Sequence, residues 1–343
     1  RLSCALSYDD RQCAPSPVLA TLEPGLAADA SIAVPPQERL QWSGELETLA
    51  ADPAPAVRPD ERVRGGSRLL QLQARCPARA FVELRLGAEE IPVPAFGLDA
   101  ALRGQLLHRA VELLYTRLGE LGLQPGQADC GGEVDAAVTA VLAAWARSRH
   151  PMLPALADIE HRRLSAQLRQ LMRAEADRPP FRVVATEQPG TIQLSGLQLD
   201  LRLDRLDRLQ DDSLLVIDYK TGRRLPATAW SGDRLAEPQL PLYAIANPVD
   251  GIAVLQINAD GVELRGVSRN DTKTRGLRTV TRFTRGAADN WEDLTRQWRR
   301  ALGAVAAEFV AGSCAIDRDD PGPALGQFAP LTRVYSMPDE ADA

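Results

Sequence analysis

The sequence predicts an α/β or α+β fold in which a mostly antiparallel sheet is flanked by helices. Two observations predict it. Apolar residues recur at helical spacing in several long segments. Residues 181–219 instead alternate polar with apolar residues, or run apolar between Pro, Gly and Asp, as strands and hairpins do. Because helical segments precede and follow this strand region, we expect the sheet to be covered by helices.

The predicted elements follow in order along the chain. Residues 1–62 are rich in Pro and Ala, and we interpret them as the tail of a preceding domain plus a linker, which leaves 63–343 as one folded domain. A helix from Ser67 to about Leu86 should be interrupted near Pro77. The other expected elements are helices at about 98–121, 133–148 and 159–177, strands within 181–219, a helix at 237–246, strands at 251–258 and 261–267, and an amphipathic helix at 289–311.

Composition indicates a globular protein. The 343 residues are 45% hydrophobic and 25% charged, which is ordinary for a chain with a packed core. No apolar run approaches the ~20 residues of a membrane-spanning helix, and no signal-peptide pattern is present. The start at Arg1, without Met, favours a fragment of a longer protein. Five scattered cysteines without a C-x-x-C pair favour the reducing cytoplasm over a disulfide framework.

The basic residues are biased towards arginine. The net charge of −6 does not exclude nucleic acid, because a local basic patch decides such binding. Of the 40 basic residues only Lys220 and Lys273 are lysines. We infer that a lysine retained against this bias supplies chemistry that the permanently charged guanidinium cannot.

The first chemical motif is Asp218-Tyr219-Lys220, at the end of an apolar run. Alternate residues of a strand share a face, so Asp218 and Lys220 should point the same way and Tyr219 the other way. A carboxylate there can hold a hard cation, and the ammonium can orient or help to deprotonate a water. The alternative is a surface ion pair at a strand end, and the tripeptide alone does not decide between them.

A second carboxylate precedes the first by 14 residues (218 − 204). Two strands joined by a tight turn would bring Asp204 beside Asp218, so that both bind one Mg²⁺ at ~2.1 Å. Two buried carboxylates that close repel each other unless a cation lies between them. The alternative makes Asp204 and Asp207 outward-facing partners of Arg205 and Arg208, which suits Asp207 better than Asp204.

Three further side chains stand at helical spacing. His108 follows Gly104 by four residues on one helix face, and an imidazole ligand favours a site that accepts Mn²⁺ as well as Mg²⁺. The alternative is a core histidine among leucines. Gln239 and Tyr243 can present an amide and a phenol to one phosphate or water, although Tyr243 also fits a plain core position.

Together these motifs resemble the RecB-type branch of the PD-(D/E)XK nucleases, especially the nuclease domain that ends AddB-like helicase-nuclease subunits. The resemblance covers about 64–312. Each motif alone is weak, whereas the ordered set is specific: GxxxH at His108, LDRLDR around Asp204, DYKTG from Asp218 and QxxxY from Gln239. The resemblance implies a restriction-endonuclease-like core, with a mixed central sheet flanked by helices and a helical insertion.

The resemblance also implies a function. It implies a metal-dependent deoxyribonuclease with exonuclease activity, which acts in DNA end processing and double-strand break repair. Residues 3–23 are similar to the end of the family's helicase-like portion, so the expected partners are DNA and a helicase subunit or a helicase-like portion of the same longer protein. One or two Mg²⁺ or Mn²⁺ ions are the implied cofactors.

The family's residue roles carry over to matching positions. The resemblance implies that the metal is held by His108, Asp204, Asp218 and the main-chain carbonyl of Tyr219. Lys220 would serve the attacking water, which makes Asp204, Asp218 and Lys220 the implied catalytic residues. The implied substrate-side residues are Gln239 and Tyr243.

Arginines near the sheet edge are expected to contact DNA phosphates with little sequence preference. The candidates are Arg205, Arg223 and Arg224. The alternative for Arg223 and Arg224 is a solvated turn.

The cysteines depart from the family pattern. Many relatives pair a cysteine in the position of Cys76 with three C-terminal cysteines to hold an iron–sulfur cluster, which needs four thiolates. Only Cys314 follows the last expected helix. We therefore predict no iron–sulfur cluster and a buried packing role for Cys76. Apolar packing of the 289–311 helix should then hold the two ends of the domain together.

Two other interpretations stay open. A catalytically quiet DNA-binding or assembly module that retains the fold is favoured by the missing cysteines and the acidic net charge. The intact His–Asp–Asp–Lys set favours the enzyme, because a scaffold has no use for ligands and lysine together. An α/β protein unrelated to nucleic acid would require all four motifs to be coincidence.

Overall fold

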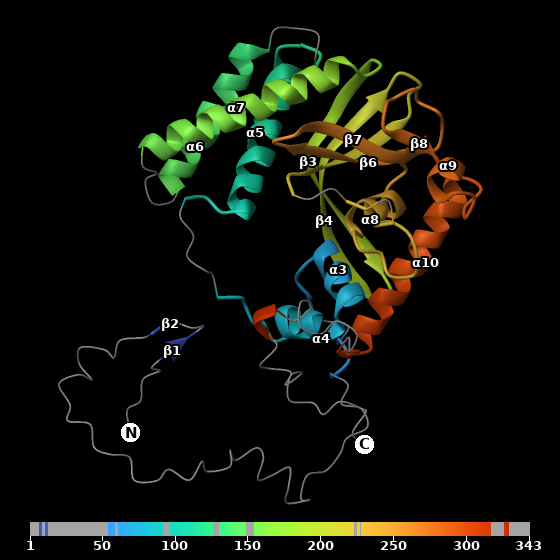
Figure 1. Cartoon of the computed structure of the whole chain (residues 1–343). Coiled ribbons are helices and arrows are strands. Elements are labelled where there is room, and N and C mark those ends of the chain that lie inside the picture. Colours follow the sequence, from blue (N-terminus) through green and yellow to red (C-terminus); the bar gives the residue numbers. More distant parts are fainter. Residues whose placement is uncertain are drawn as a thin grey trace, which may run out of the picture. The chain divides into compact units, whose positions relative to one another are not determined.

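Figure 1 shows the computed structural model of the chain, which divides into two units, Arg1–Asp52 and Pro53–Ala343. The structure describes residues 7–8, 11–12, 54–58, 61–91, 97–125, 130–148, 154–222, 225–226, 228–316 and 326–328. In the first unit, β1 (Ser7–Tyr8) pairs antiparallel with β2 (Arg11–Gln12). Most of the expected tail and linker lies outside the described residues, as do Arg223 and Arg224.

The second unit is built on one six-stranded sheet, in which the strands follow each other in chain order. Its strands are β3 (Phe181–Leu194), β4 (Leu197–Leu209), β5 (Leu214–Lys220), β6 (Gly251–Asn258), β7 (Gly261–Ser268) and β8 (Leu277–Thr279). The β5–β6 and β7–β8 pairs are parallel, and the other three pairs are antiparallel. The expected mixed, mostly antiparallel sheet is confirmed.

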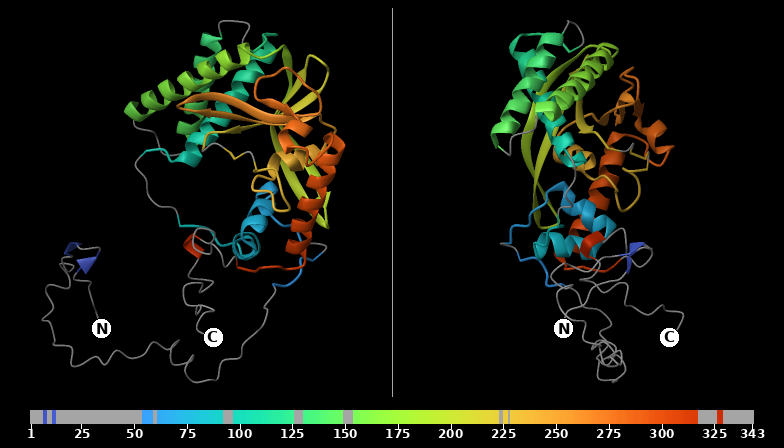
Figure 2. Two further views of the ribbon diagram at one scale, coloured as in Figure 1. Left: turned by 45° about the vertical axis from the view of Figure 1, so that its right-hand side comes forward. Right: turned by 60° about the vertical axis from the view of Figure 1, so that its left-hand side comes forward.

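Helices cover both faces of this sheet (Figures 1 and 2). The helices are α3 (Ser67–Arg75), α4 (Pro77–Ala80), a π-helical turn (Phe81–Arg85), α5 (Ala100–Glu120), α6 (Gly131–Ser148), α7 (Pro154–Ala176), α8 (Gln239–Ala246), α9 (Val280–Thr284) and α10 (Trp291–Val310). A 3-10 turn follows at Gly326–Phe328. The expected break at Pro77 is confirmed, since Pro77 begins α4, where its missing N–H costs no hydrogen bond.

Two buried clusters lie on the two sides of the sheet. Val216 belongs to the cluster that contains α3, α8 and α10, on what we call the α8 face. Its neighbours Leu215 and Ile217 belong to the cluster that contains α5, α6 and α7, on the α5 face. This alternation follows from the two-residue period of a strand. The residues that end β5 are thereby assigned to opposite faces in turn.

A two-residue turn sets the register of the longest hairpin. Ser195 and Gly196, with φ angles of 48° and 87°, connect β3 to β4 and leave Leu194 paired with Leu197. Such primed turns match the twist of the strands they join, and the second position suits glycine because it needs a positive φ. The pairings from Leu194 back to Ala185 are counted from this turn, and the register shifts between Ala185 and Val183.

A buried network of charges braces β4 on its α5-face side. Arg205 is fully buried, and its guanidinium contacts Asp207 Oδ1 at 2.5 Å and Glu175 Oε1 at 2.6 Å. It also donates to the Tyr115 hydroxyl at 2.6 Å. Arg178 contacts both acids, at 2.6 and 2.9 Å. Two guanidinium groups thus offset two carboxylates away from solvent, which ties α5 and α7 to the sheet.

This network corrects two expectations. Arg205 was expected to contact DNA phosphate, but its side chain has no exposed surface and its donors are occupied by Asp207, Glu175 and Tyr115. Asp207 was expected to face outward, but it too is fully buried. The sequence pattern suggests a surface ion pair because charged residues alternate along a strand, and only the packing of α5 and α7 encloses them.

The two ends of the second unit are held together by α10. Ala54 N donates to Gly312 O at 2.9 Å, and Val57 N donates to Val310 O at 2.8 Å, so the expected linker contacts the end of the last long helix. Cys76 is 1% exposed, which confirms its predicted burial. Backbone hydrogen bonds therefore add to the expected apolar packing of this helix.

One part of the sheet was not expected. The short β8 and α9 occupy a segment for which no element was predicted. β8 is a three-residue strand that pairs parallel with β7. In the described part of the chain, no helix is long and apolar enough to cross a membrane.

The buried network generates a stability prediction. Arg205→Met should lower the free energy of unfolding by about 3–5 kcal/mol, because it leaves buried carboxylates unpaired while keeping most of the apolar volume. Arg208→Met is the matched control on the same strand: Arg208 is 42% exposed and lies 3.9 Å from Asp212. Its loss should cost less than ~1 kcal/mol. Urea unfolding of both variants measures the difference, and equal losses would contradict the structural role of Arg205.

Candidate metal and catalytic site

The β4–β5 register brings two carboxylates together. Arg205 pairs with Ile217, so the next step along both strands places Asp204 beside Asp218. The Tyr219 N–H confirms this proximity by donating to Asp204 Oδ2 at 2.8 Å. Asp204 is 9% exposed and Asp218 is 2% exposed. The expected meeting of these two side chains therefore occurs, at the edge of the core.

A third carboxylate lies on the other side of Asp204. Gln188 pairs with Leu203, so Glu187 is opposite Asp204 across β3 and β4. Glu187 has a φ of 50°, a left-handed conformation that costs a non-glycine residue about 1–3 kcal/mol and is often found at functional sites. Its Oε2 lies 2.5 Å from Arg202 Nε. Neighbouring strands thus align three acids in a row.

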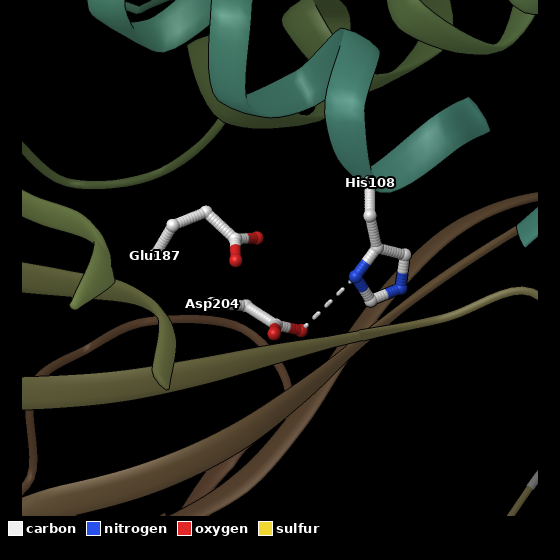
Figure 3. Close-up of side chains that lie close together, drawn as sticks. All are labelled: His108, Glu187 and Asp204. Atoms are coloured by element: carbon white, nitrogen blue, oxygen red, sulfur yellow. Dashed lines mark ion pairs between the residues drawn. The ribbon is translucent and has the colours of Figure 1, made fainter. Parts of the chain in front are cut away.

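Helix α5 adds an imidazole to this row, as Figure 3 shows. His108 Nε2 lies 3.0 Å from the Tyr219 carbonyl oxygen, which can only accept, so Nε2 carries the proton. Nδ1 is then the acceptor nitrogen, and it lies 3.5 Å from Asp204 Oδ2. Burial lowers the pKa of His108, although Asp218 opposes the change. A neutral imidazole held by its other nitrogen is the form that ligates metals.

The arrangement fits a divalent cation. One ligand atom each of His108, Glu187 and Asp204 lies within 4.8 Å of the others. These residues line a cleft of about 440 Å³ between α5 and the β3–β4 hairpin, together with Arg109 and Arg202. Two carboxylate oxygens and one imidazole nitrogen are ligands that Mg²⁺ and Mn²⁺ accept.

The electrostatics of the row support the same conclusion. Burial and the neighbouring charge of Asp218 raise the pKa of Asp204 to about 8. Burial also raises the pKa of Asp218, although Lys220 and His108 oppose it, and burial raises the pKa of Glu187 against the opposing charge of Arg202. Buried acids with raised pKa values lack sufficient positive charge nearby, which a bound cation supplies.

Lys220 lies on the same side of β5 as Asp218. Its Nζ is 3.1 Å from Asp218 Oδ2 and 3.9 Å from Glu237 Oε2. Burial works against the ammonium, but Asp218 and Glu237 outweigh it and raise the pKa of Lys220. Glu237 is itself held by Gln71 Nε2, which donates to Oε1 at 3.0 Å. Tyr219 belongs to the α5-face cluster, so the expected alternation at the end of β5 is confirmed.

Helix α8 approaches the row from the α8 face. Tyr243 is 3% exposed, and its pKa is raised by burial and then by the charges of Asp204 and Asp218, which places the phenol near both acids. Gln239 begins the same helix, one turn earlier, and is partly exposed. Among the predicted site residues that the structure describes, all except Arg205 therefore lie around one part of the sheet, with Gln239 at its margin.

Two acids escaped the sequence prediction. Glu237 stands in a loop without a motif. Glu187 had an available signal: counting outward from the Ser195-Gly196 turn pairs residue 187 with Asp204. The count requires that turn to be recognised as a two-residue hairpin loop. Because the sequence analysis did not identify this turn, Glu187 was not among the predicted site residues.

The fold and the site define a class. A mixed sheet that presents acids and a histidine at a cleft, with a lysine beside one of the acids, is typical of enzymes that use a divalent cation. The sequence pattern described as "PD-(D/E)XK nuclease superfamily" matches residues 68–321. The chain belongs to this superfamily, and its membership implies metal-dependent nuclease activity.

Other comparisons add little. No curated protein matched the sequence. A solved structure titled "Crystal structure of SSO0001" is similar over 68% of this chain and 83% of that chain, with 14% sequence identity and a TM-score of 0.21.

The raised pKa of Asp204 generates a prediction about stability and pH. Because its pKa rises from 3.8 to about 8 on folding, the folded state favours the protonated acid. The contribution of protonated Asp204 to the free energy of unfolding is fully present below about pH 3.8, and it is lost as the pH rises towards 8. Without metal, Asp204→Asn should therefore raise the melting temperature at pH 8.5 more than at pH 5. Thermal melts in a chelator measure this difference.

Asp233→Asn, at an exposed position, is the control and should show no such pH dependence. Mn²⁺ should stabilise the wild-type protein more than Asp204→Asn, because only a ligand of the folded state shifts the equilibrium. If Asp204→Asn shifted the melting temperature equally at both pH values, the raised pKa of Asp204 in the folded protein would be contradicted.

Proposed function

We propose that this chain is a metal-dependent deoxyribonuclease whose phosphodiester hydrolysis takes place at Asp204, Asp218 and Lys220. The observation that carries the proposal is the pair of buried aspartates on adjacent strands, Asp204 and Asp218, with Lys220 Nζ 3.1 Å from Asp218. Such a pair destabilises the fold unless a cation is bound, and the lysine beside it has a role in hydrolysis that a scaffold does not need.

The metal ligands in this proposal are side chains that face the cleft. His108 Nδ1, Asp204 and Glu187 provide three of them, and Asp218 adds a carboxylate from the neighbouring strand. The Tyr219 carbonyl accepts a hydrogen bond from His108, but its second lone pair stays available to a cation. A bound Mg²⁺ or Mn²⁺ would polarise the scissile phosphate and lower the pKa of a water.

The remaining roles belong to the protein's own groups. Asp218 and Glu237 hold the Lys220 ammonium in place and keep it charged, so that it can orient a water and offset charge that develops on the phosphate. The raised pKa of Tyr243 keeps its phenol protonated and able to donate. Gln239, one helical turn before it, can contact the same phosphate.

The biological context is a further part of the proposal. The resemblance to RecB-type and AddB-type nuclease domains favours an exonuclease that processes broken DNA ends in double-strand break repair. It also favours work beside a helicase subunit or a helicase-like portion of the same longer protein, in the cytoplasm. Membership of the PD-(D/E)XK nuclease superfamily supports the chemistry on which this context depends.

The second candidate is a catalytically quiet DNA-binding or assembly module. The acidic net charge of −6 and the single cysteine after α10 favour it. The Asp218–Lys220 contact and the third acid, Glu187, favour the enzyme, because a module without chemistry gains nothing from charges that destabilise it.

A cleavage assay decides between them. Linear single-stranded and double-stranded DNA should be hydrolysed with Mg²⁺ or Mn²⁺ and not with a chelator. Asp218→Asn should abolish hydrolysis, and Lys220→Met should reduce the rate by at least about 100-fold, as expected for loss of a group that assists proton transfer. Lys273→Met is the matched control, since Lys273 is an exposed lysine that pairs with Asp271. It should retain the wild-type rate.

Two outcomes would count against the enzyme. Equal activity in Lys220→Met and Lys273→Met would remove Lys220 from the mechanism. DNA binding without cleavage at any metal concentration, with a folded wild-type protein, would favour the quiet module.

A further inference from the structure

A second cavity lies on the α8 face, beyond the catalytic row. It has a volume of about 500 Å³, within the range of small-ligand sites. Trp230 and Phe283 form an aromatic wall, with ring centroids 5.8 Å apart and planes tilted by 38°. The α9 segment that contributes Phe283 is the one for which the sequence predicted no element. We call this cavity the Trp230 pocket.

The sheet register connects the pocket to the site. In the parallel β5–β6 pair, Asp218 is opposite Val254 and Lys220 is opposite Gln256, and both β6 residues line the pocket. Paired residues of neighbouring strands point to the same face, so the pocket floor continues the row that carries Asp218 and Lys220. Strands lie about 5 Å apart, which puts the floor roughly 5–10 Å from the catalytic lysine.

The chain itself also runs from the site to the pocket. Gln256 Nε2 donates to the Gly222 carbonyl, two residues after Lys220. Leu225, three residues further, lines the pocket. A polymer whose phosphate lies at the row would therefore have its adjoining unit beside the pocket.

Basic side chains line the rim of the pocket. Arg278 and Arg285 are exposed, and neither has an ion pair with any residue in the part of the chain that the structure describes. Among the described residues that line the pocket, the one acid is Glu263, and it is paired with Arg265 at 2.8 Å. The rim therefore has a net positive charge, although the whole chain carries −6.

We propose that the Trp230 pocket binds one unstacked nucleobase of a single DNA strand that extends from the cleavage site, with an adjoining phosphate on Arg278 and Arg285. This proposal rests on the proposed nuclease function and names a subsite for its substrate. An aromatic wall beside basic side chains is the combination that binds single strands, because every base has a face that can stack and every link has a phosphate. A paired base in a duplex is not free to enter.

The experiment measures DNA binding without cleavage. Fluorescence anisotropy in a chelator compares a labelled thymidine oligomer with an oligomer of the same length that has abasic sites. Phe283→Ala should weaken binding of the thymidine oligomer about 5- to 20-fold. The abasic oligomer should bind Phe283→Ala and wild type with equal affinity. The substitution and the removal of the bases each eliminate the same stacking contact between a base and Phe283.

The arginines are tested by their salt dependence. Arg278→Ala/Arg285→Ala should weaken binding of both oligomers, and the slope of log affinity against log salt should fall by about 0.7, because one phosphate is no longer neutralised. Arg162→Ala/Arg173→Ala removes the same charge from exposed positions of α7, on the α5 face, and should change neither affinity nor slope. Phe283→Leu keeps an apolar side chain and, with thermal melts, separates lost stacking from lost folding.

The proposal is overturned if both double-arginine variants bind alike, or if Phe283→Ala still distinguishes the two oligomers as wild type does. It is also overturned if folded wild-type protein binds neither oligomer at low salt. None of these results depends on hydrolysis, whereas the proposed function fails only through the cleavage assay. The two failures are therefore distinguishable.

Discussion

The arrangement of this site depends on the pairing of β3, β4 and β5, which holds Glu187, Asp204 and Asp218 side by side. The acids gain nothing from this position: burial disfavours the charge of all three, and Asp218 and Glu187 further disfavour the charge of Asp204. Backbone hydrogen bonds and apolar packing on both faces impose it. Glu187 adopts its left-handed conformation between two residues, Thr186 and Gln188, that are both paired with β4.

The two aspartates of the LDRLDR segment show how partners decide roles. Asp207 accepts contacts from Arg205 and Arg178, so its charge is offset and its place is structural. Asp204 has the Tyr219 N–H as a donor and lies 3.5 Å from a neutral imidazole. Asp207 is therefore compensated by the protein's own cations, whereas burial and Asp218 raise the pKa of Asp204 to about 8. The compensated acid belongs to the network that ties α5 and α7 to the sheet, and α5 in turn carries His108.

Sequence periodicity was sufficient for the long elements and for the shared face of Asp218 and Lys220, because both follow from local backbone geometry. The proximity of Asp204 to Asp218 required only one turn to be located. The predictions that failed depend on contacts between residues distant in sequence. Arg205 is buried because α5 and α7 pack over it, and β8 forms by pairing with the edge of β7. Glu187 lies between these cases, since a count from the β3–β4 turn reaches it but no local motif marks it.

The same electrostatics bear on how DNA reaches the site. A row of buried acids repels a phosphate, so a substrate can approach only when a cation compensates the acids or when basic groups bind the strand on either side. Lys220 contacts Asp218, Arg109 and Arg202 line the cleft beside Glu187 and Asp204, and Arg278 and Arg285 line the Trp230 pocket. An acidic protein can therefore bind DNA locally, provided that its positive charge lies along the path of the strand. In the proposed enzyme, a bound metal would relieve both the repulsion among the acids and the repulsion between the acids and the phosphate.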